Sequence, residues 1–178
     1  MSAITRTPKN INYLQPNKFL LEFSRTPNMQ YFAQSVTVPG ISLSEAIILT
    51  PFVDLYAPGE KAIYDILNVT LLVDEELQSW LEIHDWIRAM TFPESFEDYL
   101  QLPKLSKNAG VSSTKPQYSD ATLTLLSSAN TPTWRFKFID CFPTSLSAIV
   151  MSASDSPETV ITSDATFRFS YYNVEKLF

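Results

Sequence analysis

The 178-residue chain contains few of the residues on which many enzyme sites depend. It has three glycines, one histidine and one cysteine. Because the glycines are isolated at Gly40, Gly59 and Gly110, they cannot form a GxGxxG or GxxxxGK loop, which excludes these two phosphate-binding motifs. The single Cys141 excludes an intrachain disulfide and a CxxC metal pair. The single His84 has no second histidine or cysteine partner in a spacing that would build a conventional zinc site.

The charge balance and the lack of a long apolar run exclude two further classes of protein. The formal net charge is −6 and the sequence pI is about 4.7, which is the wrong sign for a protein that binds nucleic acid through its phosphates. No stretch approaches the roughly 18 apolar residues that a membrane-spanning helix needs. We therefore expect a soluble protein of a reducing compartment, with no membrane insertion of its own and no cleavable signal.

Three groups of potentially reactive side chains have simpler structural interpretations. Asp74, Glu75 and Glu76 lie where a helix is expected to begin, and the helix dipole favours their ionised form instead of the raised pKa of a general acid. The serines of residues 145–158 lack a GxSxG motif. Cys141 has no histidine nearby in sequence, so we expect a buried structural thiol. We predict no catalytic residue, no cofactor and no metal site, and hence a protein that is not an enzyme.

The sequence does contain a strong alternation of large aromatic and polar residues. The aromatic residues occupy every second position in two segments: Trp134, Phe136 and Phe138, and then Phe167, Phe169 and Tyr171. This alternation is typical of half-buried antiparallel strands. Twelve prolines interrupt the chain at short intervals, as turns between many short strands require. The pattern predicts a mainly β fold, an antiparallel β-barrel or sandwich with one flanking helix.

The same pattern divides the chain into an arm and one domain. Residues 1–16 are polar and contain two prolines, so we expect an N-terminal arm that is ordered only against another surface. We expect a single β domain at 17–178, in which strands at 17–23 and 30–40 form a hairpin. A strand at 66–73 leads directly into a helix that Asp74 caps and whose first turn holds Glu75 and Glu76. Residues 91–120 are expected to form a long loop.

The segment 41–62 is apolar on both faces of any strand it could form. Its large apolar residues are Ile47, Ile48, Leu49, Phe52, Val53, Leu55 and Tyr56. A solvent-exposed hairpin of this kind is an aggregation site unless another chain covers it. Two interpretations are open: a subunit interface, or part of the chain's own core.

Several segments resemble, in their order and spacing, the tail tube protein family of contractile-tailed (T4-like) bacteriophages. This family includes the baseplate tube-initiator proteins that share its fold. The matching segments are "PNKFLLEF", "SVTVPGIS", "VTLLVDEELQSWLEIHDWI", "FIDCFPTSLSAIVMS" and "TFRFSYYNV". Together they span about residues 16–176.

The resemblance implies a structural virion protein. It implies a tail tube subunit that forms stacked hexameric rings and makes the conduit for DNA ejection. The implied partners are further copies of the chain, tail sheath and baseplate proteins, and double-stranded DNA that passes through without tight binding. The implied location is the phage tail, after assembly in the bacterial host cytoplasm. By position, the hairpin at 41–62 corresponds to the family's long contact between subunits and between rings.

Three functional alternatives are open. The chain is either the repeating tube subunit or a tube-initiator ring of the same fold, and we favour the repeating subunit because nothing beyond one domain is present. The alternative from a different class is a monomeric β-barrel that binds a ligand or acts as an enzyme. A ligand-binding module would have a pocket of convergent polar groups, whereas a tube protein would form rings.

A conduit for DNA also predicts the chemistry of its wall. Small hydroxyl or acidic side chains should line it, because basic side chains would hold the passing phosphates. Ser35 and Thr37 in the strand at 30–40, and Thr122 and Thr124 in a strand at 121–128, lie on the polar side of their alternation. These four are the candidate lining residues, and the alternative is that they face bulk solvent.

Overall fold

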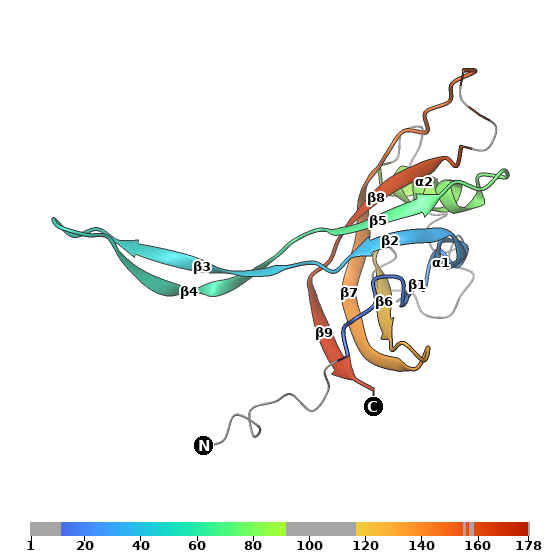
Figure 1. The fold of residues 1–178 in the computed structure, drawn as a ribbon. Helices are drawn as coiled ribbons and strands as arrows, with labels where there is room; N and C mark the ends of the chain where they lie inside the picture. Colours follow the sequence, from blue (N-terminus) through green and yellow to red (C-terminus); the bar gives the residue numbers. More distant parts are fainter. Residues whose placement is uncertain (1–11, 92–116, 155, 157–158, 178) are drawn as a thin grey trace.

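The structure is a computed structural model that describes residues 12–91, 117–154, 156 and 159–177. The predicted loop at 91–120 lies mostly outside the described residues, as does most of the predicted N-terminal arm. Figure 1 shows a β-rich body from which a long two-stranded hairpin projects. In the described part of the chain, no helix is both long and apolar enough to cross a membrane.

Antiparallel strands build the body. They are β1 (Phe19–Phe23), β2 (Ala33–Thr37), β5 (Leu67–Leu72), β6 (Ser119–Leu126), β7 (Pro132–Leu146), β8 (Thr162–Arg168) and β9 (Tyr171–Lys176). Their order is β1-β6-β7-β8-β5-β2, and β9 pairs with β7. The N-terminal part of β7 pairs with β6 and β9, whereas its C-terminal part pairs with β8. The predicted mainly antiparallel β fold is confirmed.

The strand β7 passes from one half of the sheet to the other near Asp140. Ile139 and Asp140 together lie opposite Asp120 of β6, which makes a β-bulge. Asp140 has a φ of 55°, a left-handed conformation that aspartate tolerates better than most residues. Such a bulge bends its strand. The bend therefore lies three residues before the buried Pro143, and the strand continues through this proline.

The two halves of the sheet pack face to face around one hydrophobic core. Their fully buried residues include Leu21, Leu67, Val69, Leu71, Leu123, Phe138, Ala165 and Phe167. The rings of Phe23 in β1 and Phe167 in β8 lie 4.7 Å apart between centroids, which places β1 against β8 across the core. Because successive side chains of a strand alternate between faces, the polar residues between these core positions point outward on two opposite sides of the sandwich.

The predicted hairpin between the first two strands is wrong. β1 pairs with β6 and β2 pairs with β5, so the two strands are not partners. The segment that was predicted as one strand at 30–40 begins instead with a short helix, α1 (Met29–Phe32), which precedes β2. Alternation identifies a strand, but it does not identify the strand with which it pairs.

Helix α2 (Gln78–Thr91) packs against β5 and β7 and closes part of the core. It buries Ile83, Trp86 and Ala89. The ring of Trp86 lies 6.4 Å from that of Phe167 between centroids, and its Nε1 donates a hydrogen bond to the carbonyl of Gln117 at 3.1 Å. The predicted flanking helix is therefore present and is joined to the sandwich by a buried tryptophan.

Helix α2 begins later than predicted, but the residue that caps it is the predicted one, Asp74. Residues 74–77 form a turn in which Leu77 has a φ of 57°, so Glu75 and Glu76 precede the helix instead of forming its first turn. The Asp74 carboxylate accepts hydrogen bonds from the N–H groups of Gln78 at 2.9 Å and Ser79 at 3.1 Å. It also accepts one from the Ser79 hydroxyl at 2.8 Å. The predicted capping role of Asp74 is confirmed.

Replacing this cap should destabilise the fold in a pH-dependent way. Burial acts to raise the pKa of Asp74, but the hydrogen bonds from Ser79 and Gln78 outweigh it and the pKa is lowered. Because the folded pKa is depressed, this stabilisation is present above the unfolded pKa and is lost as the pH falls through the folded pKa. At neutral pH, Asp74→Ala should lower the free energy of unfolding by about 1 kcal/mol, measured by urea denaturation. Glu75→Ala is the matched control, and equal losses for both variants would contradict the capping role.

The end of the chain forms two strands where the alternation predicts one. The chain turns at Phe169 and Ser170, between β8 and β9, and this turn reverses which residues point inward. Tyr172, not Tyr171, therefore joins Phe138 and Phe169 in the core, with ring centroids 5.6 and 6.0 Å away. Tyr171 is exposed.

Candidate functional site

The long hairpin is the largest projection of the described molecule (Figure 1). It consists of β3 (Ile41–Ile48) and β4 (Leu55–Tyr64), which among the described strands pair only with each other. All seven of its predicted interface residues have side chains more than half exposed: Ile47, Ile48, Leu49, Phe52, Val53, Leu55 and Tyr56. These residues therefore lie outside the core of their own chain, and the interpretation of the hairpin as ordinary core is wrong.

The base of the long hairpin is fastened to the body. The ring of Tyr64, at the end of β4, lies 5.7 Å from that of Phe169 and 5.2 Å from that of Tyr172 between centroids. The Asp65 N–H donates a hydrogen bond to the carbonyl of Gly40 at 3.1 Å, which joins the two chain segments where they leave the body. A Cβ at Gly40 would lie 2.6 Å from Asp65 Oδ2, a contact that rotation of the exposed Asp65 side chain would relieve. The hairpin is thus held at its base and uncovered at its tip.

The structure separates the four predicted channel residues into two pairs. Ser35 and Thr37 of β2 point outward from the half-sheet formed by β2, β5, β8 and the end of β7. Thr122 and Thr124 of β6 belong to the half-sheet of β1, β6, β9 and the start of β7. Because the two half-sheets pack with their inner faces together, the two pairs lie on opposite sides of the sandwich. One channel wall cannot contain both pairs from the same subunit.

Thr124 is poorly placed for any channel wall. Its side chain is only 6% exposed, because its cross-strand neighbours are the longer side chains of Leu20 and Arg135. Thr122 is half-buried, whereas Ser35 and Thr37 are exposed. The four candidate lining residues therefore differ in how far their side chains can reach a channel.

Short polar side chains cover the outward face to which Ser35 and Thr37 belong. We call this the hydroxyl face and define it by Ser35, Thr37, Asn68, Thr70, Ser145, Asp164 and Thr166. Thr70 Oγ1 donates to Asp164 Oδ1 at 2.7 Å, which joins β5 to β8. The hydroxyls of Ser145 and Thr166 lie 2.7 Å apart, which joins β8 to β7. Many polar groups of this face are therefore satisfied by one another.

The opposite outward face has longer and charged side chains. We call it the charged face and define it by Leu20, Glu22, Thr122, Thr124, Arg135, Lys137, Asn173 and Glu175. Lys137 Nζ lies 2.9 Å from Glu175 Oε1 in an exposed ion pair. The sandwich therefore presents two surfaces of different chemistry.

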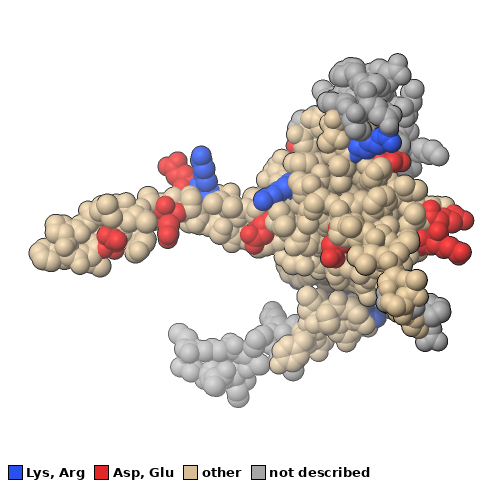
Figure 2. All heavy atoms as spheres, turned by 90° about the horizontal axis from the view of Figure 1, so that it is seen from above, with Lys and Arg blue, Asp and Glu red and all other residues tan. Residues whose placement is uncertain are grey.

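Figure 2 shows how the charged residues are distributed over one side of the molecule. Acidic side chains and a basic one lie along the long hairpin between stretches without charge, and further acidic side chains gather at the end of the body farthest from it. In Figure 1, the turn between β5 and α2, which carries Asp74, Glu75 and Glu76, lies at that end. The two ends of the molecule thus differ, because large exposed apolar residues gather toward the tip of the hairpin and an acidic turn lies at the other end.

The reactive side chains singled out in the sequence do not form a site together. Burial, with smaller contributions from Asp120 and Asp140, raises the pKa of the Cys141 thiol to about 12, so it is protonated at neutral pH. This buried thiol agrees with the expected structural role. His84 stacks on Trp80 with ring centroids 5.0 Å apart, and its Nδ1 lies 3.1 Å from Asp85 Oδ1. Among the described residues, no group of three His, Cys, Asp or Glu side chains could hold a metal ion.

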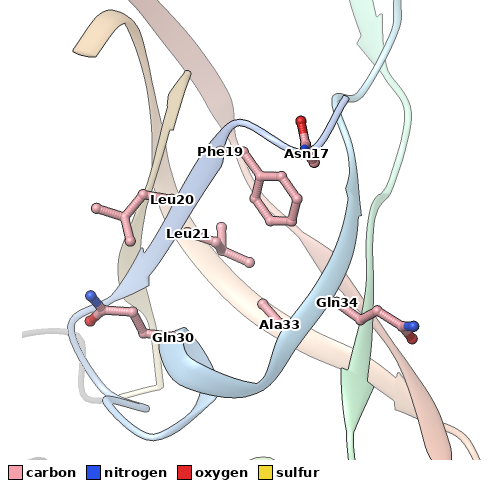
Figure 3. A pocket seen from close by; sticks show the side chains of 7 residues that line it. All are labelled: Asn17, Phe19, Leu20, Leu21, Gln30, Ala33 and Gln34. Atoms are coloured by element: carbon pink, nitrogen blue, oxygen red, sulfur yellow. The ribbon is translucent and has the colours of Figure 1, made fainter. Parts of the chain in front are cut away.

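Two shallow hollows lie in the body. One, of about 240 Å³, lies between β1 and β2, the two end strands of the sheet, and Figure 3 shows the residues that line it: Asn17, Phe19, Leu20, Leu21, Gln30, Ala33 and Gln34. None of these side chains is ionisable, so the lining contains no general acid or base. The other, of about 490 Å³, lies at the base of the long hairpin and includes Asp65 and Arg168. Arg168 Nη1 donates to the Tyr64 carbonyl at 3.5 Å, which supports the attachment of the hairpin.

The fold matches solved structures from contractile injection machines. A chain of the anti-feeding prophage baseplate matches with a TM-score of 0.59 and 12% identity, over 93% of this chain and 97% of that one. A chain of the PVC sheath/tube terminator matches with a TM-score of 0.58 and 14% identity, over 93% and 99%. The anti-feeding prophage tube terminating cap matches with a TM-score of 0.57 and 16% identity, over 98% and 99%. At these identities the likeness establishes the fold, which this chain shares with those three structures.

The sequence has a relative in a contractile-tailed phage. Over 148 residues, this chain is 28% identical to the tail tube terminator protein of Enterobacteria phage T4. The aligned region covers 81% of this chain and 77% of the relative. No family model matches the sequence. Together with the fold, this relationship confirms the predicted resemblance to the tail tube proteins of contractile phage tails. Since the relative is a terminator, the repeating role that we favoured from the sequence stays a prediction.

Proposed function

We propose that this protein is a tail tube terminator, a structural virion protein whose copies form a ring at one end of a phage tail tube. The observation that carries the proposal is its relationship to the T4 tail tube terminator over most of both chains. The fold likeness to a sheath/tube terminator and to a tube terminating cap supports it. The exposed apolar hairpin supports it independently, since a surface of this kind calls for a partner.

The long hairpin is the proposed contact between copies. In a head-to-tail ring, the hairpin of each copy would lie on the body of the next copy. Such an arrangement closes into a ring when the rotation between adjacent copies is a whole fraction of a full turn. Its seven interface residues would then be buried between subunits. The same arrangement would cover strands that pair on one side only within the described chain, namely β1, β2 and β9.

The proposed partners follow from this role. The ring would be a homo-hexamer that stacks on the last ring of the tail tube and meets sheath or baseplate proteins at the outside. Double-stranded DNA would pass through it without tight binding, in keeping with the net charge of −6. We propose that residues 17–178 act as one tail-tube-like unit and that the N-terminal arm, residues 1–16, contacts a neighbouring protein.

The position of the protein along an assembled tail tests the role. We expect a tagged copy, labelled with gold-conjugated antibody and viewed by electron microscopy, to mark one end of each tube. A tail-tube protein of the same phage with the same tag, labelled along the tube, is the control. Label from this protein along the whole length would instead identify it as the repeating subunit, and label confined to the baseplate end would identify an initiator ring.

A further inference from the structure

We propose that the hydroxyl face, and not the charged face, forms the wall of the channel through which DNA passes. This inference rests on the proposed function, because it assumes a ring that DNA crosses. It assigns the β2, β5, β8 and distal β7 half-sheet to the inside of the ring. It therefore keeps Ser35 and Thr37 as lining residues and removes Thr122 and Thr124.

The first argument is the reach of the side chains. At the centre of the hydroxyl face, the aligned residues Thr37, Asn68, Thr166 and Ser145 run across four strands, and none has a side chain longer than asparagine. The corresponding row of the charged face runs through Glu22, Thr122, Lys137 and Asn173. A wall of short side chains presents a smoother surface to a moving polymer than one with flexible lysine and glutamate side chains.

The second argument is how the polar groups are satisfied. Thr144 Oγ1 lies 2.8 Å from Thr166 Oγ1, in addition to the pairs Thr70 with Asp164 and Ser145 with Thr166. Hydroxyls that already bond to one another gain little from a new hydrogen bond to a phosphate, because an existing bond must be given up. Passing DNA would therefore find few strong donors on this face.

The third argument is charge. The charged face carries the cations Arg135 and Lys137 beside the acids Glu22 and Glu175, and Lys137 is paired with Glu175. Each cation on a channel wall that exchanges its partner for a phosphate would release counterions from DNA and strengthen binding. The hydroxyl face carries Asp164 at its middle and one cation, Arg168, which lies on the same face at the end of β8 and donates to the Tyr64 carbonyl. The hydroxyl face therefore has one cation at its end against two on the charged face, and it would hold passing DNA less strongly.

A pair of lysine variants distinguishes the two faces. Ser35→Lys combined with Thr37→Lys adds two cations to the hydroxyl face, whereas Thr122→Lys adds one to the charged face and is the control for the position of the added charge. The test measures the binding of assembled rings to linear and to covalently closed circular double-stranded DNA at low salt. DNA inside a closed ring must be threaded from an end, so linear DNA alone can reach a wall residue.

We expect rings of the Ser35→Lys, Thr37→Lys variant to bind linear DNA about tenfold or more tightly than the parent, with a steeper salt dependence. The same variant rings should bind circular DNA as tightly as the parent rings do. Rings of the Thr122→Lys variant should show no preference for linear over circular DNA. If Thr122→Lys gains the preference for linear DNA, or if neither variant does, the assignment of the wall is overturned. A parent protein that forms no rings would contradict the proposed function instead.

A labelling experiment covers the case in which the lysine variant does not assemble. Since Cys141 is buried, a single cysteine at Thr37→Cys is the reactive thiol among the described residues. In rings, this thiol should react with a small maleimide but be protected from a polymer-linked maleimide too large to enter. Thr122→Cys should show no such selectivity for reagent size. The opposite result would place the charged face inside the channel.

Discussion

The variant Ile48→Asp should lose ring assembly while keeping its fold. Ile48 lies on the long hairpin with its side chain more than half exposed, away from the core of its own chain. If the hairpin packs on the neighbouring copy, the substitution places an unpaired charge in a desolvated contact. Each contact should lose on the order of 3 kcal/mol, or roughly a hundredfold in association constant. Light scattering of the purified protein measures the loss.

The thermal transition of the monomer provides the necessary second measurement for this variant. An exposed substitution changes stability by about 0.5 kcal/mol or less, so the cooperative transition should be unchanged. Ser42→Asp adds the same charge to an exposed position near the base of the hairpin and serves as the matched control. Normal assembly of Ile48→Asp would show that the hairpin tip is not the contact, and a lost monomer transition would show that the hairpin also stabilises the fold of its own subunit.

The variant Phe167→Ala should destabilise the fold more than any surface change. The Phe167 side chain is fully buried and lies against Phe23 from the opposite half-sheet and Trp86 from α2. Removing the ring leaves a cavity where three elements meet, which costs about 3–5 kcal/mol. That is a large share of the roughly 5–15 kcal/mol by which domains are stable. Urea denaturation at neutral pH measures the effect.

Tyr171→Ala is the comparison for Phe167→Ala, because the alternation alone would place both aromatic residues on the same face. The structure places Tyr171 at the surface, after the turn between β8 and β9. Its loss should cost about 1 kcal/mol or less. Similar costs for the two variants would contradict the reversal of the alternation at Phe169 and Ser170.

The strands were predictable because each carries its own alternation, but the pairing of strands was not. β1 and β2 follow one another in the chain, and a hairpin is the usual result of that order. Here β6 takes the partner position beside β1, from a segment about 100 residues later in sequence. That preference depends on the shared core, in which Phe23 of β1 meets Phe167 of β8. No local pattern contains this information.

The helix was predictable, but the residue that anchors it was not singled out. The capping aspartate, Asp74, was found because acceptors before a helix follow a simple rule. The turn at residues 74–77, which delays the helix, depends on Leu77 in a left-handed conformation, and no residue preference predicts this. Trp86 lies on the inner face of α2, and its role became apparent only from its contacts with Phe167 and Gln117.

For the functional surfaces, the sequence identified the kind of residue but not its place. The long hairpin was recognised because apolar residues on both faces of a strand are rare in a soluble hairpin. The channel residues were selected by chemistry alone, and hydroxyls on strands of either half-sheet satisfy that criterion equally. Only the packing of the half-sheets separates Thr37 from Thr122 and buries Thr124.

The symmetry and position of the protein's density on tail tubes test the central claim most directly. Tubes assembled with the purified protein should be imaged by cryo-electron microscopy, and their ends averaged separately from their shafts. We expect one additional six-fold ring at a single end of each tube, with the long hairpins between adjacent subunits. A protein that remains monomeric beside unmodified tube ends would contradict the account, as would its density in every ring of the shaft.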